Sequence, residues 1–99
     1  MNSEEIFELI RQNKSELDRF GASRIGLFGS QIRGDATEES DIDFIVEFVS
    51  GRKNYDNYIN LCFFLEELFN KKIDLLTTES LSPHLKDRIL AEAQYENIH

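Results

Sequence analysis

The segment from Asp41 to Val49 constrains the fold of this chain more than any other part of the sequence. Its residues at positions 42, 44, 46 and 48 are all apolar, whereas positions 41, 43 and 47 carry acidic side chains. Successive side chains of a β-strand point to opposite faces, so this alternation predicts a strand with one apolar and one acidic face. Ile45 is the apolar exception on the acidic face.

The rest of the chain alternates helical and strand patterns. Apolar residues at three-to-four spacing predict a helix over residues 3–20. A second helix is predicted after a break at residues 50–54, and its apolar stripe ends at Phe69. Short strands are predicted at 24–28 and 71–76, and a helical turn followed by a loop at 31–40. Ser82 is expected to cap a last helix whose buried side carries Leu85, Ile89, Leu90 and Ala93. This order predicts an α/β fold with helices packed against a short sheet.

The chain has 99 residues, 11 of them Lys or Arg and 19 Asp or Glu, with a formal net charge of −8 at pH 7. This length predicts a single domain over residues 1–99. Without a cluster of basic residues, an acidic chain disfavours DNA or RNA as its main ligand and suits metal ions or a basic partner protein. Cys62 is the only cysteine, which excludes a Cys-based zinc site. No signal peptide or membrane-spanning run is visible, so we expect a cytoplasmic protein.

Three aspartates on the predicted strands are candidate metal ligands. Asp41 and Asp43 share one face of their strand, where like charges raise each other's pKa unless a cation lies between them. Asp74 takes the polar face of the strand at 71–76 and would complete a cluster if the two strands are neighbours. Such oxygen ligands suit Mg²⁺ or Mn²⁺. The alternative is that these acids only face solvent, and the Asp-X-Asp pair alone does not decide between the two.

A Gly-Ser turn upstream favours a bound nucleotide. Gly29 and Ser30 follow a predicted strand, and ten residues separate Ser30 from Asp41. Glycine lets the backbone approach a ligand, the amides of such a turn can bind an anion, and the Ser30 hydroxyl adds a donor. A phosphate site beside a divalent-metal site would bind a nucleoside triphosphate as its metal complex.

Other residues give weaker signals. Arg33 either reaches a phosphate or forms a surface ion pair with Asp35 or Glu38. Phe63 and Phe64 lie off the apolar stripe of their helix and hint at a surface for a partner.

The residues Gly29–Gly34 (Gly-Ser-Gln-Ile-Arg-Gly), followed by Ser40–Val46 (Ser-Asp-Ile-Asp-Phe-Ile-Val), resemble the signature of the DNA polymerase β-like nucleotidyltransferase superfamily. The short length points to its minimal nucleotidyltransferase branch, the MNT or MntA-like antitoxins paired with HEPN ribonuclease toxins. The resemblance covers essentially the whole chain, including Lys72–Leu75, and implies a small α/β fold with a short mixed sheet packed against helices. Ile32 departs from the family pattern, where a small residue such as alanine is more usual.

The resemblance also implies roles for the candidate residues. In that family the Gly-Ser turn holds the triphosphate, two carboxylates bind the metals, and a third assists as a ligand or base. Carried over, nucleotide binding falls on Gly29, Ser30 and Arg33, and metal binding and catalysis fall on Asp41, Asp43 and Asp74.

The activity implied by the resemblance is metal-dependent transfer of AMP from ATP to a hydroxyl group, with two Mg²⁺ ions, or Mn²⁺, as cofactors. The expected acceptor is a tyrosine of a cognate HEPN toxin, which would make the chain the antitoxin of a type VII-like toxin–antitoxin pair. An oligomer is a further option for the assembly. Two alternatives stay open, a non-catalytic antitoxin that occludes its toxin and a small-molecule nucleotidyltransferase of the aminoglycoside-modifying kind. A P-loop NTPase is excluded, because no GxxxxGK[ST] motif occurs.

Overall fold

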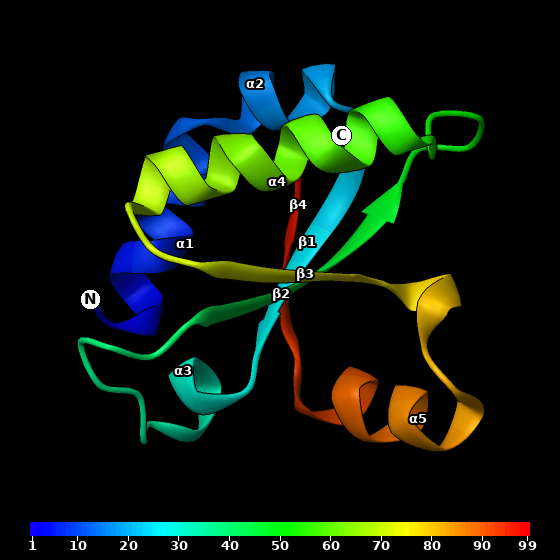
Figure 1. Ribbon diagram of the computed structural model, residues 1–99. Helices are drawn as coiled ribbons and strands as arrows, with labels where there is room; N and C mark the ends of the chain where they lie inside the picture. The colour runs from blue at the N-terminus through cyan, green and yellow to red at the C-terminus, as the bar shows by residue number, and fades with distance from the viewer.

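The computed structural model describes all residues from 1 to 99. Helices and strands alternate along the chain and build one α/β unit around a single sheet (Figure 1). The elements are, in order, α1 (Ser3–Gln12), α2 (Lys14–Arg19), β1 (Ala22–Phe28), α3 (Ser30–Arg33), β2 (Ile42–Phe48), α4 (Tyr55–Phe69), β3 (Ile73–Thr77), the 3₁₀ helix η1 (Thr78–Ser80), α5 (Pro83–Glu92) and β4 (Gln94–Asn97). None of the helices combines the length and apolar content that a membrane span requires.

The sheet is mixed, as predicted. Its strand order is β3-β2-β1-β4. Strand β1 runs antiparallel to both β2 and β4, whereas β2 and β3 run parallel. The parallel pair therefore brings the starts of β2 and β3, and the acidic residues they carry, to the same place.

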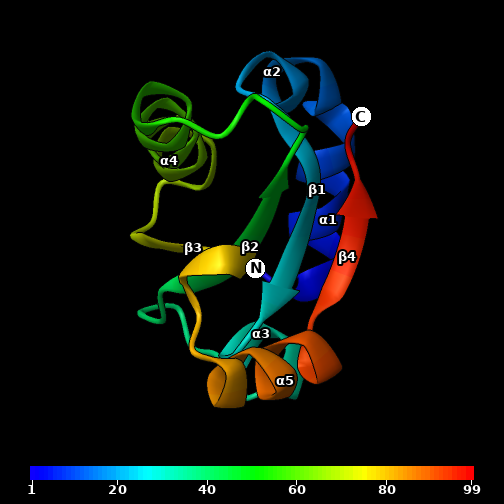
Figure 2. The same ribbon diagram turned by 90° about the vertical axis from the view of Figure 1, so that its right-hand side faces the viewer.

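Helices α1, α2 and α4 cover one face of the sheet. The apolar positions of β2 predicted from the alternation, Ile42, Phe44 and Val46, are fully buried there. They pack in one cluster with residues from these helices and the neighbouring strands, whose other buried members are Ile6, Ile10, Leu17, Ala22, Ile25, Leu27, Leu61, Leu65, Phe69, Ile73 and Leu75. Helices α3 and α5 lie together at one end of the sheet, and α2 lies at the opposite end (Figure 1 and Figure 2). That arrangement leaves the acidic face of β2 and β3 free of the main helical layer.

The prediction of one helix over residues 3–20 is wrong in one respect, because the helix is interrupted at Asn13. The Asn13 side chain donates a hydrogen bond to the Leu9 carbonyl at 2.8 Å. An asparagine side chain that bonds to the backbone competes with helical hydrogen bonding, which favours a break. The result is two short helices that still bury the predicted residues Ile6, Ile10 and Leu17.

The C-terminal end also differs from the prediction. Helix α5 begins as expected with the Ser82 side chain as its N-cap, but it ends at Glu92. Its first residue is Pro83. Ala93, predicted on its buried side, is instead an extended residue with ψ 142°. The chain continues into β4, which no pattern predicted, and which pairs with β1 from Arg24 to Leu27.

Candidate active site

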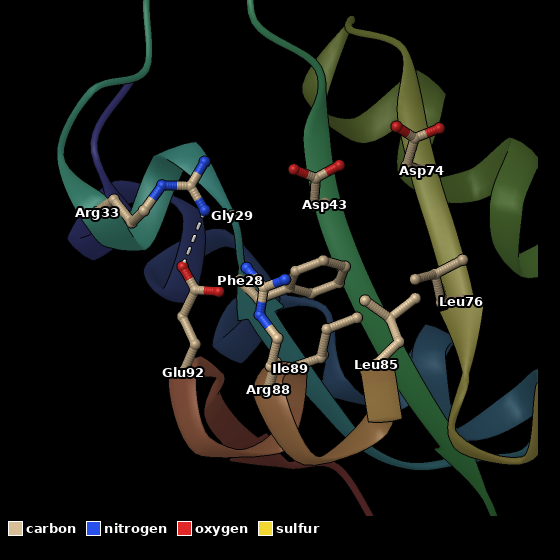
Figure 3. A pocket seen from close by; sticks show the side chains of 10 residues that line it. All are labelled: Phe28, Gly29, Arg33, Asp43, Asp74, Leu76, Leu85, Arg88, Ile89 and Glu92. Carbon is tan, nitrogen blue, oxygen red and sulfur yellow. Dashed lines mark hydrogen bonds and ion pairs between the residues drawn. The ribbon is translucent and has the colours of Figure 1, made fainter. Parts of the chain in front are cut away.

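A pocket of about 320 Å³ opens where α5 faces the ends of the sheet strands (Figure 3). This volume falls at the lower end of the range for small-molecule sites. One wall comes from β2 and β3, a second from α5, and a third from the turn that joins β1 to α3. The lining residues are Phe28, Gly29, Arg33, Asp43, Asp74, Leu76, Leu85, Arg88, Ile89 and Glu92.

Two of the predicted aspartates, Asp43 and Asp74, stand side by side in this pocket. They are direct partners in the parallel register of β2 and β3. Both project on the side opposite the core, because the residues that flank them in their strands are buried in the helix-covered cluster. Asp43 is half-buried and Asp74 is exposed at the mouth of the pocket.

The surroundings raise the pKa of Asp43 to about 6. The largest cause is burial, which disfavours the charged form, and the next is the negative charge of Asp74, with a smaller contribution from Asp41. Arg33 acts in the opposite direction and lowers this pKa. The neighbouring carboxylates of Asp43 and Asp74 therefore repel each other, and a divalent cation between them would relieve that repulsion.

The turn before α3 is shaped to fit Asp43. Gly29 adopts φ 74° and ψ −147°, a backbone conformation that is essentially restricted to glycine. A Cβ atom placed on Gly29 would lie 3.1 Å from Asp43 Cγ and closer still to a carboxylate oxygen. The predicted glycine is therefore needed both for its backbone conformation and for the absence of a side chain.

The other two predicted residues lie outside the pocket lining. Ser30 is the first residue of α3, and its hydroxyl makes no hydrogen bond within the chain. Asp41 directly precedes β2, and its carboxylate lies 3.9 Å from Lys72 Nζ. No three acidic, histidine or cysteine side chains converge closely enough to surround one metal ion in this arrangement. The structure thus brings together Gly29, Asp43 and Asp74, and leaves Asp41 turned toward Lys72.

The donor set still fits a divalent cation. The paired carboxylates of Asp43 and Asp74 offer the hard oxygen ligands that Mg²⁺ prefers. Because Mg²⁺ keeps several waters and binds through one or two carboxylates, it does not require a closed cage of protein ligands. Asp43 and Asp74 supply those two carboxylates, with Asp41 two residues away along the chain.

Arg33 is engaged by acidic partners in the structure. Its guanidinium lies 3.6 Å from Asp35, one of the two ion-pair partners named as alternatives to a phosphate, and pairs with Glu92 of α5 at 3.1 Å. The alternative partner, Glu38, is not used. A phosphate contact of Arg33 stays a prediction. Figure 3 shows the Arg33–Glu92 ion pair bridging α3 and α5 across one side of the pocket.

Sequence reasoning missed the contribution of α5 to the pocket. Leu85, Arg88, Ile89 and Glu92 all line it. Their spacing of three, one and three residues places them on one face of a helix. This spacing is the sequence feature from which their shared position could have been predicted. The sequence predicts Leu85 and Ile89 on the buried side of this helix, but Leu85 is 42% exposed and Ile89 alone of the two is buried.

The two phenylalanines of α4 that were expected at a partner surface separate in the structure. Phe63 is 60% exposed, as predicted. Phe64 instead packs on Phe20, with ring centroids 5.6 Å apart, and belongs to the periphery of the core. The exposure expected of Phe64 is only partly met, because Phe20, at the C-terminal end of α2, lies against that side of α4.

The chain matches known proteins in both sequence and structure. Residues 8–95 match the family model described as a nucleotidyltransferase domain. The chain is 38% identical over 93 residues to the protein adenylyltransferase MntA of Thermococcus cleftensis, and the alignment covers 93% of each chain. It superposes on a structure provisionally described as a minimal nucleotidyltransferase with a TM-score of 0.81, 34% identity and 95% coverage of both chains. A chain from a crystal structure of a toxin–antitoxin with AMP-PNP matches with a TM-score of 0.66 and 25% identity, covering 96% of this chain and 72% of that one.

Proposed function

Because this chain belongs to the nucleotidyltransferase domain family, we propose that it transfers AMP from ATP to a hydroxyl group of a partner protein. The observation that carries the proposal is the in-register pair Asp43 and Asp74, held beside Gly29 in a pocket of suitable size. The similarity to a protein adenylyltransferase over nearly the full length of both chains supports a protein as the acceptor.

ATP is the nucleotide that this proposal assigns to the pocket. A structural relative was crystallised with AMP-PNP, an analogue of ATP. In our proposal the triphosphate lies against the turn at Gly29 and Ser30, where the absence of a side chain on Gly29 permits close approach. Asp43, Asp74 and Asp41 would hold Mg²⁺, and Mn²⁺ could take its place. To bind the metal, the Asp41 carboxylate would have to leave its ion pair with Lys72.

When bound, Mg²⁺ supplies charge neutralisation for the triphosphate and lowers the pKa of an attacking hydroxyl. The protein side chains then position the reaction. The acceptor oxygen attacks the α-phosphorus of ATP, the bond from that phosphorus to the bridging oxygen breaks, and pyrophosphate leaves. Asp74, the more exposed carboxylate, lies at the mouth of the pocket where the acceptor enters, and in this proposal it takes the hydroxyl proton.

The acceptor in this proposal is a tyrosine of a HEPN toxin. The open mouth of the pocket at Asp74 gives access to a side chain presented by another protein. The match to a chain of a toxin–antitoxin structure supports an antitoxin role. Modification of the toxin rather than mere occlusion is favoured by the Asp43–Asp74 pair, because two repelling carboxylates cost stability and serve no evident structural purpose.

Transfer of label from ATP tests this function. The chain is incubated with Mg²⁺ and a purified HEPN partner, using ATP labelled in parallel reactions at the α- or the γ-phosphate. We expect label on the partner from α-labelled ATP alone, and none with the Asp43→Asn variant. Label from γ-labelled ATP would identify a kinase instead, and the absence of label with a stable complex would favour occlusion.

A further inference from the structure

We propose that Arg88 of α5 is the side chain that binds the triphosphate tail of the nucleotide. This inference rests on the proposed function and adds to it a residue that neither the Gly-Ser nor the Asp-X-Asp pattern includes. It assigns α5 a role in substrate binding in addition to its role as a wall of the pocket.

The first observation is that Arg88 is an unpaired cation in a strongly acidic protein. Nearly every Lys and Arg side chain of the chain is held by an acidic group or a backbone carbonyl. Lys86 and Arg88 are the two that form neither an ion pair nor a hydrogen bond. Arg88 is solvent-exposed, so its guanidinium is free to pair with an anionic ligand that enters the pocket.

The second observation is the position of Arg88. It lines the pocket, whereas Lys86 does not. In Figure 3 its side chain rises from α5 toward Phe28, beside the turn that carries Gly29. Arg88 is thus the one cation lining the pocket that has no acidic partner of its own.

The acidic residue of α5 that could form an ion pair with Arg88 is already paired with another arginine. Glu92 lies four residues further along α5, the spacing at which opposite charges pair on a helix. Its carboxylate is instead held by Arg33 of α3 at 3.1 Å. The Arg33–Glu92 pair therefore joins α5 to α3 and leaves the five N–H donors of Arg88 available, in the planar arrangement that matches phosphate oxygens.

The distribution of charge in the pocket matches a metal–triphosphate complex. The wall formed by β2 and β3 is acidic, through Asp43 and Asp74, and the wall formed by α5 contributes the unpaired cation Arg88. Such a complex is positive at its metal and negative along its phosphates. The acidic wall would therefore face the metal, and Arg88 would face the phosphates beyond the α-phosphate.

Nucleotide binding by variants of the full chain tests this assignment. Binding of ATP and AMP, each with Mg²⁺, is measured by displacement of a fluorescent ATP analogue from the wild type, Arg88→Ala, Arg88→Lys and Lys86→Ala. We expect Arg88→Ala to weaken ATP binding about 10- to 100-fold, the loss of one to two charge-assisted hydrogen bonds, and to change AMP binding less than threefold. Arg88→Lys should recover part of the lost affinity, because lysine keeps the positive charge but lacks the planar set of N–H donors of the guanidinium group.

The Lys86→Ala variant is the matched control, because it removes the other unpaired cation from the same helix, outside the pocket. It should bind ATP as the wild type does. The Arg88 assignment is overturned if Arg88→Ala binds ATP within twofold of the wild type, or if ATP and AMP weaken equally. A wild-type chain that does not bind ATP with Mg²⁺ would instead overturn the proposed function, so the two failures are distinguishable.

Discussion

The Asp43 carboxylate occupies the space beside Gly29 that the side chain of any other residue would need. A Cβ atom at Gly29 would lie 3.1 Å from Asp43 Cγ. Asp43 reaches this place because it pairs with Phe28, the last residue of β1, immediately before the turn. The glycine turn and the acidic strand thus form one structural unit, although 13 positions separate Gly29 and Asp43 along the chain.

The first prediction concerns the substitution Gly29→Ala. The added methyl group must displace Asp43, and the backbone conformation is strained for alanine, so we expect a loss of stability of about 1–3 kcal/mol. We also expect nucleotidyl transfer to be abolished. Gly51→Ala is the matched control, because Gly51 also has a positive φ of 82° but has nothing within 4 Å of an added Cβ. Chemical denaturation and label transfer separate the two, and transfer activity in Gly29→Ala close to that of Gly51→Ala would contradict the account.

The second prediction is that Asp43→Asn stabilises the protein at neutral pH in the absence of metal. The pKa of Asp43 is about 6 in the fold against an ordinary value of 3.8, so between these values the folded state binds more protons than the unfolded state. Stability of the wild type therefore falls as the pH rises through this window, and the loss is complete above pH 6. The amide has no charge to bury, and it escapes this loss.

Thermal unfolding in a chelating buffer at several pH values measures this effect. The melting temperature of Asp43→Asn should exceed that of the wild type at pH 7.5, and the difference should shrink toward pH 4. A wild type that is more stable than the variant at pH 7.5 without metal would show that Asp43 has a structural role.

The third prediction concerns the ion pair that joins α3 to α5. Glu92→Gln removes the charge that holds Arg33, while keeping the shape of the side chain. Because Arg33 is exposed and Glu92 is only partly buried, we expect a stability change of about 1 kcal/mol or less. We expect a larger local effect, with faster hydrogen exchange over residues 83–92 and weaker ATP binding. Glu79→Gln is the control, because it breaks an ion pair of the same length with Lys53 outside the pocket. Equal hydrogen-exchange rates of α5 in the two variants would contradict the claim that Glu92 holds α5 against α3.

The fourth prediction separates the two phenylalanines of α4. Phe63→Gln should change the free energy of unfolding by less than about 0.5 kcal/mol, because Phe63 is mostly exposed. Phe64→Ala should cost about 2 kcal/mol, because it removes a ring that packs on Phe20 and the edge of the core. Urea denaturation of both variants measures the difference, and a similar loss in both would mean that Phe63 also packs in the folded chain.

Much of the fold could be predicted from local patterns. The alternation of apolar and acidic residues was sufficient to predict the two faces of β2. Ile42, Phe44 and Val46 are buried on one face, and Asp43 lies on the other. The same reasoning placed Asp74 opposite its buried neighbours Ile73 and Leu75. The family resemblance added the mixed sheet, which strand patterns alone do not reveal.

What local patterns could not predict depends on contacts between distant segments. Strand β4 has four residues and no apolar alternation, and it is held by pairing with β1 and by ion pairs from Glu96 to Arg11 and Lys14. The pairing of Asp43 with Asp74 follows from the register of two strands separated by α4. The role of Arg88 could not be predicted for a similar reason, because its place in the pocket depends on how α5 packs against the end of the sheet.

The measurement that tests the central claim most directly is the intact mass of a HEPN partner after incubation with a substoichiometric amount of this chain, ATP and Mg²⁺. The account predicts that the whole partner population gains mass in units of AMP, because each enzyme molecule acts repeatedly. It predicts no gain with Asp43→Asn. A partner that keeps its original mass, and is neutralised only when the chain is present in equal amounts, would contradict catalysis through Asp43 and Asp74.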